Sequence, residues 1–214
     1  MSVQIPNGSI VSIAAAYAAA DTVSAATNAN PSVLTSTAHG ISNGAFFEWT
    51  SGWSRANGRI FRASGVATNS ISPEGLDTSS TTRYPAGSGT GSIREITSWT
   101  QLAQILNSSS NGGEQQFTEY QFLEADAASR IPTNKSARGL TFSVADDISL
   151  PGYVIAQTAN DDRLPRAVRI VLPSGGIILY NAYISLGEPS LTTNEIMAVE
   201  VTLSLVNQSV RYAS

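Results

Sequence analysis

The chain has 214 residues, a net charge of −4 and no cysteine. Charged residues make up 13% of it, about half the usual share, and small polar residues take their place. This composition excludes a basic nucleic-acid binder, a disulfide framework and a thiolate metal site. Few charges among many small polar residues are typical of surfaces that become covered in an assembly, because burying a charge costs solvation energy.

The first apolar segment, residues 9–26, is rich in alanine and resembles a signal peptide. It lacks a preceding Lys or Arg, Asp21 interrupts it, and it is too weakly apolar to span a membrane. We therefore expect a strand over residues 10–17 and no membrane partner.

A small β module is predicted for residues 27–90. Asn30-Pro31 favours an extended entry, and Asn57-Gly58 is a strong turn signal between the predicted strands 46–50 and 59–65. A further strand is expected at 33–37. Residues 1–26 and 91–214 are expected to form the main β body beside this module.

The module ends in a polar, glycine-rich stretch, residues 76–92, which we expect to be a long flexible loop. A strand is predicted next at 93–96. Ser98 and Gln101 then have the spacing of a capping box, which predicts a short helix. Residues 108–113 are expected to form a loop.

The last hundred residues predict strands at 116–124, 138–145, 167–172, 177–186 and 195–206. In the last of these, Val199, Val201 and Leu203 alternate with small polar or acidic residues, and the strand at 138–145 has the same two faces. Such strands indicate a sheet with one packed face and one wet face.

One helix is predicted over residues 149–161, with Ser149 as its cap and Pro151 in its first turn. Its apolar positions are expected to pack on the sheet. These positions are Leu150, Val154, Ile155 and Ala159.

The sequence contains no recognisable catalytic or cofactor-binding motif. His39 is the single histidine and adjoins Gly40 in a predicted turn, and no serine lies in a nucleophile elbow. The glycines of residues 87–92 are not followed by Lys-Ser or Lys-Thr. The three tryptophans could stack on bases or sugars, but packing anchors are the favoured interpretation. We therefore predict a non-enzyme without cofactor or metal.

The C-terminal motifs carry a family resemblance. The stretch from Val144-Ala145-Asp146-Asp147 through the helix to Leu164, the segment AVRIVLPSGG at 167–176, and the ending from Ala182-Tyr183 to Arg211-Tyr212 are similar to tail tube proteins of long, non-contractile-tailed bacteriophages. The resemblance implies a mainly β fold, a β-sandwich with one flanking helix, formed by residues 1–26 and 91–214 with the module at 27–90 as an insertion. It also implies hexameric rings stacked into a hollow tube that delivers DNA.

The resemblance implies sites for assembly rather than chemistry. We expect a lumen that does not bind DNA, because small polar and acidic side chains offer no cation to phosphates. The predicted lumen-facing residues are Glu119, Thr141, Ser143, Glu200, Thr202 and Ser204. The predicted contact between rings is the loop, through Asp77, Thr78, Arg83, Tyr84, Gly87, Gly89 and Gly91, with residues 1–9 as a second candidate.

The implied partners are further copies of the chain, together with tape-measure, tail-tip and tail-terminator proteins. The implied location is the virion tail after assembly in the host cytoplasm. Other roles remain open from the residues alone: a tail terminator, a capsid-decorating protein, the tube of a secretion needle, or a carbohydrate-binding adhesin module.

Overall fold

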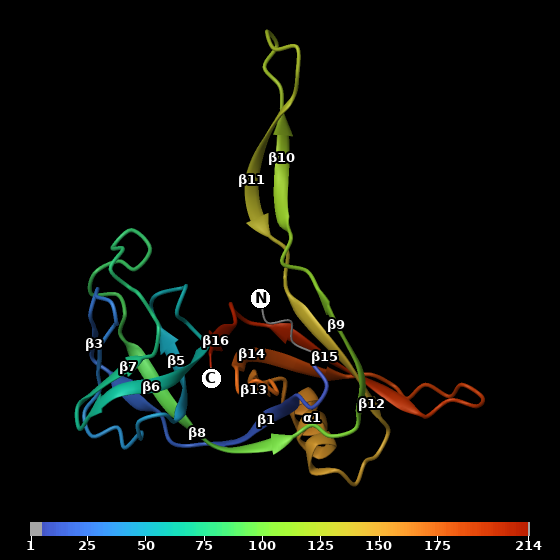
Figure 1. Ribbon diagram of the computed structural model, residues 1–214. Coiled ribbons are helices and arrows are strands. Elements are labelled where there is room, and N and C mark those ends of the chain that lie inside the picture. Colours follow the sequence, from blue (N-terminus) through green and yellow to red (C-terminus); the bar gives the residue numbers. More distant parts are fainter. Residues whose placement is uncertain (1–5, 214) are drawn as a thin grey trace.

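Strands dominate the computed structural model, which describes residues 6–213, and most of them belong to one bent antiparallel sheet (Figure 1). The strand order is β3-β4-β7-β6-β5-β8-β1-β13-β14-β15-β12-β9, with β2 beside β8 and β16 beside β14. The strands are β1 (Ile10–Tyr17), β2 (Asp21–Val23), β3 (Ala25–Ala26), β4 (Leu34–Thr35), β5 (Phe46–Ser51), β6 (Arg59–Ala67), β7 (Ser70–Pro73), β8 (Gly91–Gln101), β9 (Ile105–Asn111), β10 (Gln115–Tyr120), β11 (Ser129–Lys135), β12 (Gly139–Ala145), β13 (Arg166–Val171), β14 (Ile177–Leu186), β15 (Ala198–Leu205) and β16 (Val210–Tyr212). The fold is mainly β with one flanking helix, as predicted.

The body of the protein consists of β1, β13, β14, β15, β12 and β9, with helix α1 (Pro151–Asp162) on one face. That face is apolar: Phe142, Val144, Val201 and Leu203 are almost completely buried. The helix brings Ala156 and Ala159 against the sheet, and both are fully buried. Small side chains allow the helix and the sheet to approach closely.

The helix differs from its predicted form at the start. Leu150 occupies the N-cap position and no side chain caps it, because the Ser149 hydroxyl donates to Asp147 Oδ1 at 2.6 Å. Gly152 is buried, and an added Cβ there would collide with the carbonyl oxygen of Gln101. No helix within residues 6–213 is long and apolar enough to cross a membrane.

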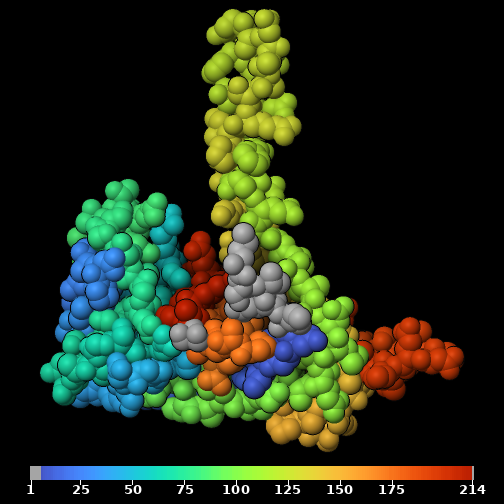
Figure 2. All heavy atoms as spheres, viewed as in Figure 1, coloured from blue at the N-terminus to red at the C-terminus, as the bar shows by residue number. Residues whose placement is uncertain are grey.

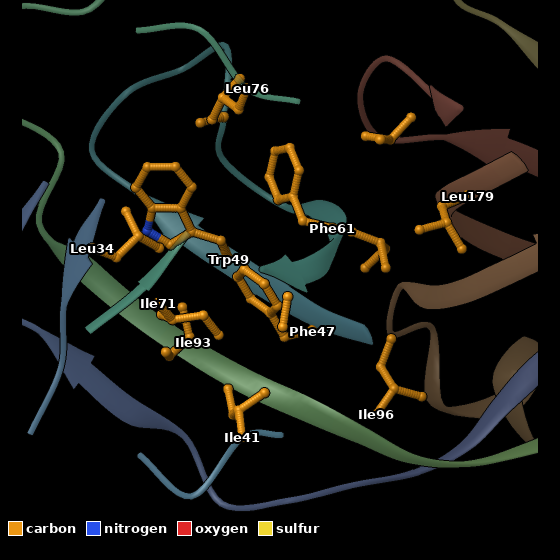
Figure 3. Packing of buried hydrophobic residues seen from close by; sticks show 14 of the residues in the cluster. Leu34, Ile41, Phe47, Trp49, Phe61, Ile71, Leu76, Ile93, Ile96 and Leu179 are labelled. Atoms are coloured by element: carbon orange, nitrogen blue, oxygen red, sulfur yellow. The ribbon is translucent and has the colours of Figure 1, made fainter. Parts of the chain in front are cut away.

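A second part of the molecule, which we call the lobe, comprises β2–β7, the first half of β8 and the loop at residues 76–90. Its core is aromatic: Phe47, Trp49 and Phe61 lie among Leu34, Ile71, Ile93 and Leu76 (Figure 3). Trp53 is 1% exposed and its ring lies 5.8 Å from that of Trp49. The same core includes Leu179 of β14, so the lobe packs directly against the body.

Strand β8 joins the lobe to the body. Its first half pairs with β5 in the lobe and its second half with β1 in the body. The predicted helix at Ser98 and Gln101 is therefore wrong: Ser98 pairs with Ala16 and Gln101 with Ser12. The long-range pairing with β1 outweighs a local capping signal that has little helix-forming sequence behind it.

A long two-stranded arm, residues 113–136, stands clear of the body in this view (Figures 1 and 2). It continues the β9–β12 pair as β10 and β11 and ends in a turn at residues 121–128. Residues 105–111 form β9, so the loop predicted at 108–113 begins only after Asn111. Gly112 has φ +72° and an added Cβ would collide with Ala137 O, so glycine is required where the arm leaves the sheet.

Candidate assembly surfaces

The face of the body sheet opposite the helix is polar and open. Directly paired residues share a face, and Thr141 pairs with both Thr202 and Ser109, while Ser143 pairs with Glu200 and Asn107. The row continues onto β14, where Ser185 pairs with Thr202. Its polar members are Asn107, Ser109, Asn111, Thr141, Ser143, Tyr183, Ser185, Glu200, Thr202 and Ser204. We call this set the polar face.

The structure thus brings five of the six predicted lumen residues together. Thr141, Ser143, Glu200, Thr202 and Ser204 occupy two neighbouring strands of the polar face. Glu200 is the one carboxylate in the set, and no member is Lys or Arg. Glu119 is different: it lies in β10 of the arm and accepts a hydrogen bond from Arg130 Nε at 3.1 Å. A sequence pattern places a residue on a strand but not on a particular sheet.

The polar face ends at an unpaired strand edge. β9 pairs with β12 on one side and is the last strand of the sheet order. Its residues from Leu106 to Asn111 are exposed. An open edge of this kind presents free N–H and C=O groups to another chain.

The predicted inter-ring loop is packed onto the lobe rather than free. The Thr78 hydroxyl is completely buried, donates to Thr27 O at 2.7 Å and accepts from Ala29 N. Asn28 Nδ2 donates to Thr78 O and, at 2.8 Å, to Tyr84 O. These bonds anchor the loop at two points, so the structure gives no support to the flexible loop expected from its glycines and serines.

Its seven predicted contact residues divide into two groups. Thr78, Tyr84 and Gly89 are buried in the lobe. Gly91 begins β8, where the backbone of Thr50 approaches it so closely that an added Cβ would collide with Thr50 O. Asp77, Arg83 and Gly87 remain exposed. The second candidate, residues 1–9, lies mostly outside the described residues.

The arm is the feature that sequence reasoning missed. Every residue of β11, and every residue of β10 except Gln115, is exposed, including Phe117 at 57% and Ile131 at 53%. The aromatic run at 116–124 predicted a strand, which ends at Tyr120, so residues 121–124 lie in the turn instead. Nothing in the run indicates that the strand leaves the body. Pro132 in β11 is the one available signal, because proline is confined to strands with an unpaired edge.

The four predicted helix-packing residues are placed unequally. Ala159 is fully buried and Ile155 is partly buried against the body core. Leu150 precedes the helix, and Val154 is 49% exposed, so Val154 does not pack as predicted. Gly152 and Ala156 take the buried positions instead.

The residues considered for chemistry are structural. His39 is buried, its Nδ1 accepts from Ile41 N, and its Nε2 lies 3.0 Å from Ala67 O. Trp49 and Trp53 are buried in the lobe core, and Trp99 is partly buried with its ring 5.9 Å from that of Phe46 and 4.7 Å from the Arg169 guanidinium. All three therefore pack within the molecule, as the favoured interpretation expects.

A family model described as phage tail tube protein matches residues 51–214, well over half of the chain and starting at the last residue of β5. No curated protein matches. Among solved structures, chains from the virion of a native gene transfer agent particle and from the tail of the empty particle, refined with C6 symmetry, are each 12% identical. Each aligns over 54% of this chain and 89% or 87% of its own, with a TM-score of 0.43.

A sheath/tube terminator of an extracellular contractile injection system is 16% identical over 49% of this chain and 84% of its own, with a TM-score of 0.37. These scores are low, and the assignment depends on the family model. The chain belongs to the phage tail tube protein family, whose members are structural proteins of the virion tail.

Proposed function

We propose that this chain is the repeating subunit of a hollow tail tube, in which six copies close each ring and the rings stack. The observation that carries the proposal is the polar face, which combines uncharged, mostly small polar side chains with one carboxylate and adjoins the unpaired edge of β9. The apolar face of the same strands is buried as part of the body core.

The unpaired edge of the sheet supports closure of the copies into a ring. Pairing of β9 with a strand of a neighbouring copy would satisfy its free backbone groups, and closure into a barrel removes such edges altogether. The polar face would then line the inside of the barrel, and α1 would lie outside it.

The lumen would let DNA pass without holding it. DNA affinity comes mainly from cations that neutralise phosphates, and the polar face has none. Glu200 adds a weak repulsion there. The partners are other copies of the chain, with tape-measure, tail-tip and tail-terminator proteins at the ends and inside of the tube. Assembly in the host cytoplasm belongs to the same proposal.

The arm replaces the lobe loop as the candidate contact between rings. It projects from the body, and its apolar side chains have no partner within residues 6–213 beyond the arm itself. A two-stranded ribbon is marginally stable alone, so contact with another subunit is the natural way to cover it.

Electron microscopy of the purified protein tests the proposal, with a tail-tip complex added as initiator. Indefinite hollow tubes of constant width support it, whereas single rings indicate a terminator. Glu200→Lys should leave folding and tube formation intact and slow DNA release, because it places six cations in each ring of the lumen. Asp161→Lys, the same charge change on the outer helix, is the control.

Equal release rates for Glu200→Lys and Asp161→Lys tubes would show that the polar face does not line the lumen.

A further inference from the structure

The tip of the arm, residues 121–128, is both apolar and acidic. Phe122 is 62% exposed and Leu123 is fully exposed. Glu124 and Asp126 are also exposed, and neither forms an ion pair with another described residue. The turn is held in shape by its own contacts, among them Gln121 Nε2 donating to the Ala125 carbonyl at 2.8 Å. An ordered turn with these side chains is suited to docking on another surface.

The surface where the arm joins the sheet, which we call the root, has the opposite charge. Two adjoining hollows lie there, of about 210 and 160 Å³, and they share Arg138 and Leu205. Lys135 lines the first and Arg211 lines the second. No Asp or Glu lines either hollow, and the three cations form no ion pair within residues 6–213.

The root also has an apolar part that matches the tip. Leu205 lies between the two hollows, with Leu140 and Tyr180 in one and Val206, 41% exposed, in the other. The tip offers an apolar pair followed by two acids, and the root offers apolar side chains edged by three cations. Complementary charge of this kind selects the partner and its orientation.

The tip cannot reach the root of its own chain, because the arm holds the two at opposite ends (Figure 1). Gln121 lies eight positions after Gly113, and at about 3.3 Å per step the arm is roughly 26 Å long. β12, with 7 residues, covers six such steps and is about 20 Å long. One arm is therefore comparable in length to a body strand, so its tip can reach a copy stacked beyond it.

We infer that the arm tip of one copy docks in the root of a second copy, with Phe122 and Leu123 on the apolar surface and Glu124 and Asp126 beside Arg138 and Arg211. The contact is heterologous, so every copy offers a tip to one neighbour and a root to another, and the contact can repeat along the tube. It depends on the proposed function, since it requires stacked copies, and it names the surfaces that the stacking uses.

Charge reversal tests the pairing in the full-length protein. Arg138→Glu/Arg211→Glu should raise the critical concentration for tube formation at least tenfold, and so should Glu124→Arg/Asp126→Arg. Combining all four changes restores opposite charges and should return the critical concentration to within about threefold of wild type. Arg55→Glu, at an exposed cation of the lobe, is the control and should have no effect. Thermal unfolding of each monomer verifies its fold.

The outcomes separate this inference from the proposed function. Double variants that form tubes at the wild-type concentration, or a fourfold variant that does not recover, would overturn the docking while tubes of wild-type protein still support the subunit role. Wild-type protein that never forms tubes with a tail-tip initiator would overturn both. Loss of binding to a labelled DNA duplex in Arg138→Glu/Arg211→Glu, with normal tubes, would make the root a DNA contact and overturn the docking.

Discussion

The lobe buries its large aromatic side chains, whereas the arm exposes its own to solvent. In the lobe, Phe47, Trp49 and Phe61 are at most 1% exposed and pack around one core. In the arm, Phe117 and Phe122 are more than half exposed. Burial of the first group stabilises the folded monomer, and the second group can contribute only when another surface covers it. The two regions therefore separate residues for folding from residues for assembly.

The largest expected effect compares one phenylalanine from each region. Phe61→Ala removes a buried ring that lies 6.1 Å from Phe47 and 6.3 Å from Trp49. It should lower the free energy of unfolding by about 3–5 kcal/mol. Phe117→Ala in the arm should change it by less than about 0.5 kcal/mol. Urea unfolding of the monomers measures both changes. Equal decreases in the free energy of unfolding for the two variants would contradict the assignment of the arm phenylalanine to assembly.

A smaller effect is expected at the contact between the lobe and the body. The carboxylate of Glu48 is buried and accepts hydrogen bonds from Arg94 Nε at 2.6 Å and Asn181 Nδ2 at 2.8 Å. Glu48→Gln should lower the free energy of unfolding by about 2 kcal/mol, because hydrogen bonds to a charged group are lost while the partly exposed Arg94 stays hydrated.

The arm supplies the matched control. Glu119 pairs with Arg130 in an exposed ion pair, so Glu119→Gln should cost less than about 0.5 kcal/mol. A loss at Glu119 as large as that at Glu48 would contradict the view that the arm adds little to monomer stability.

An effect confined to alkaline pH is expected at Tyr212 of β16, which packs in the core that the lobe shares with the body. Burial raises the pKa of Tyr212 from its ordinary value of 10 to about 12, and its hydroxyl accepts from Arg62 N at 2.9 Å. Because the unfolded chain ionises first, this contribution to stability is complete below pH 10 and is lost as the pH rises towards 12. Tyr212→Phe should flatten that decline, measured by urea unfolding from pH 9 to 12.

Two further tyrosines matter for this measurement, one as a second contributor to the pH dependence and one as a control. Burial also raises the pKa of Tyr17, which adds a decline of the same sign that remains in Tyr212→Phe. Tyr120→Phe in the arm is the control. A decline of unchanged slope in Tyr212→Phe would assign the whole pH dependence to other groups.

Local patterns predicted the strands that are buried on one face. β1 and β14 have the predicted bounds, and the alternation of Val199, Val201 and Leu203 placed the polar face correctly. Alternation works there because one face of the strand meets a core and the other meets solvent. The same argument failed for β9, whose polar residues from Asn107 to Asn111 have no buried side to mark them.

The sequence by itself determined the β class, the helix, the two-faced strands and the lack of cations on the polar face, because each depends on residue type and short-range periodicity. The tertiary structure alone decided that Ser98 lies in a strand, that Thr78 anchors a loop to the lobe, and that Glu119 stands on an arm away from Glu200. These outcomes depend on pairings between residues far apart in the chain, such as Ser98 with Ala16, and a local pattern contains no information about its distant partner.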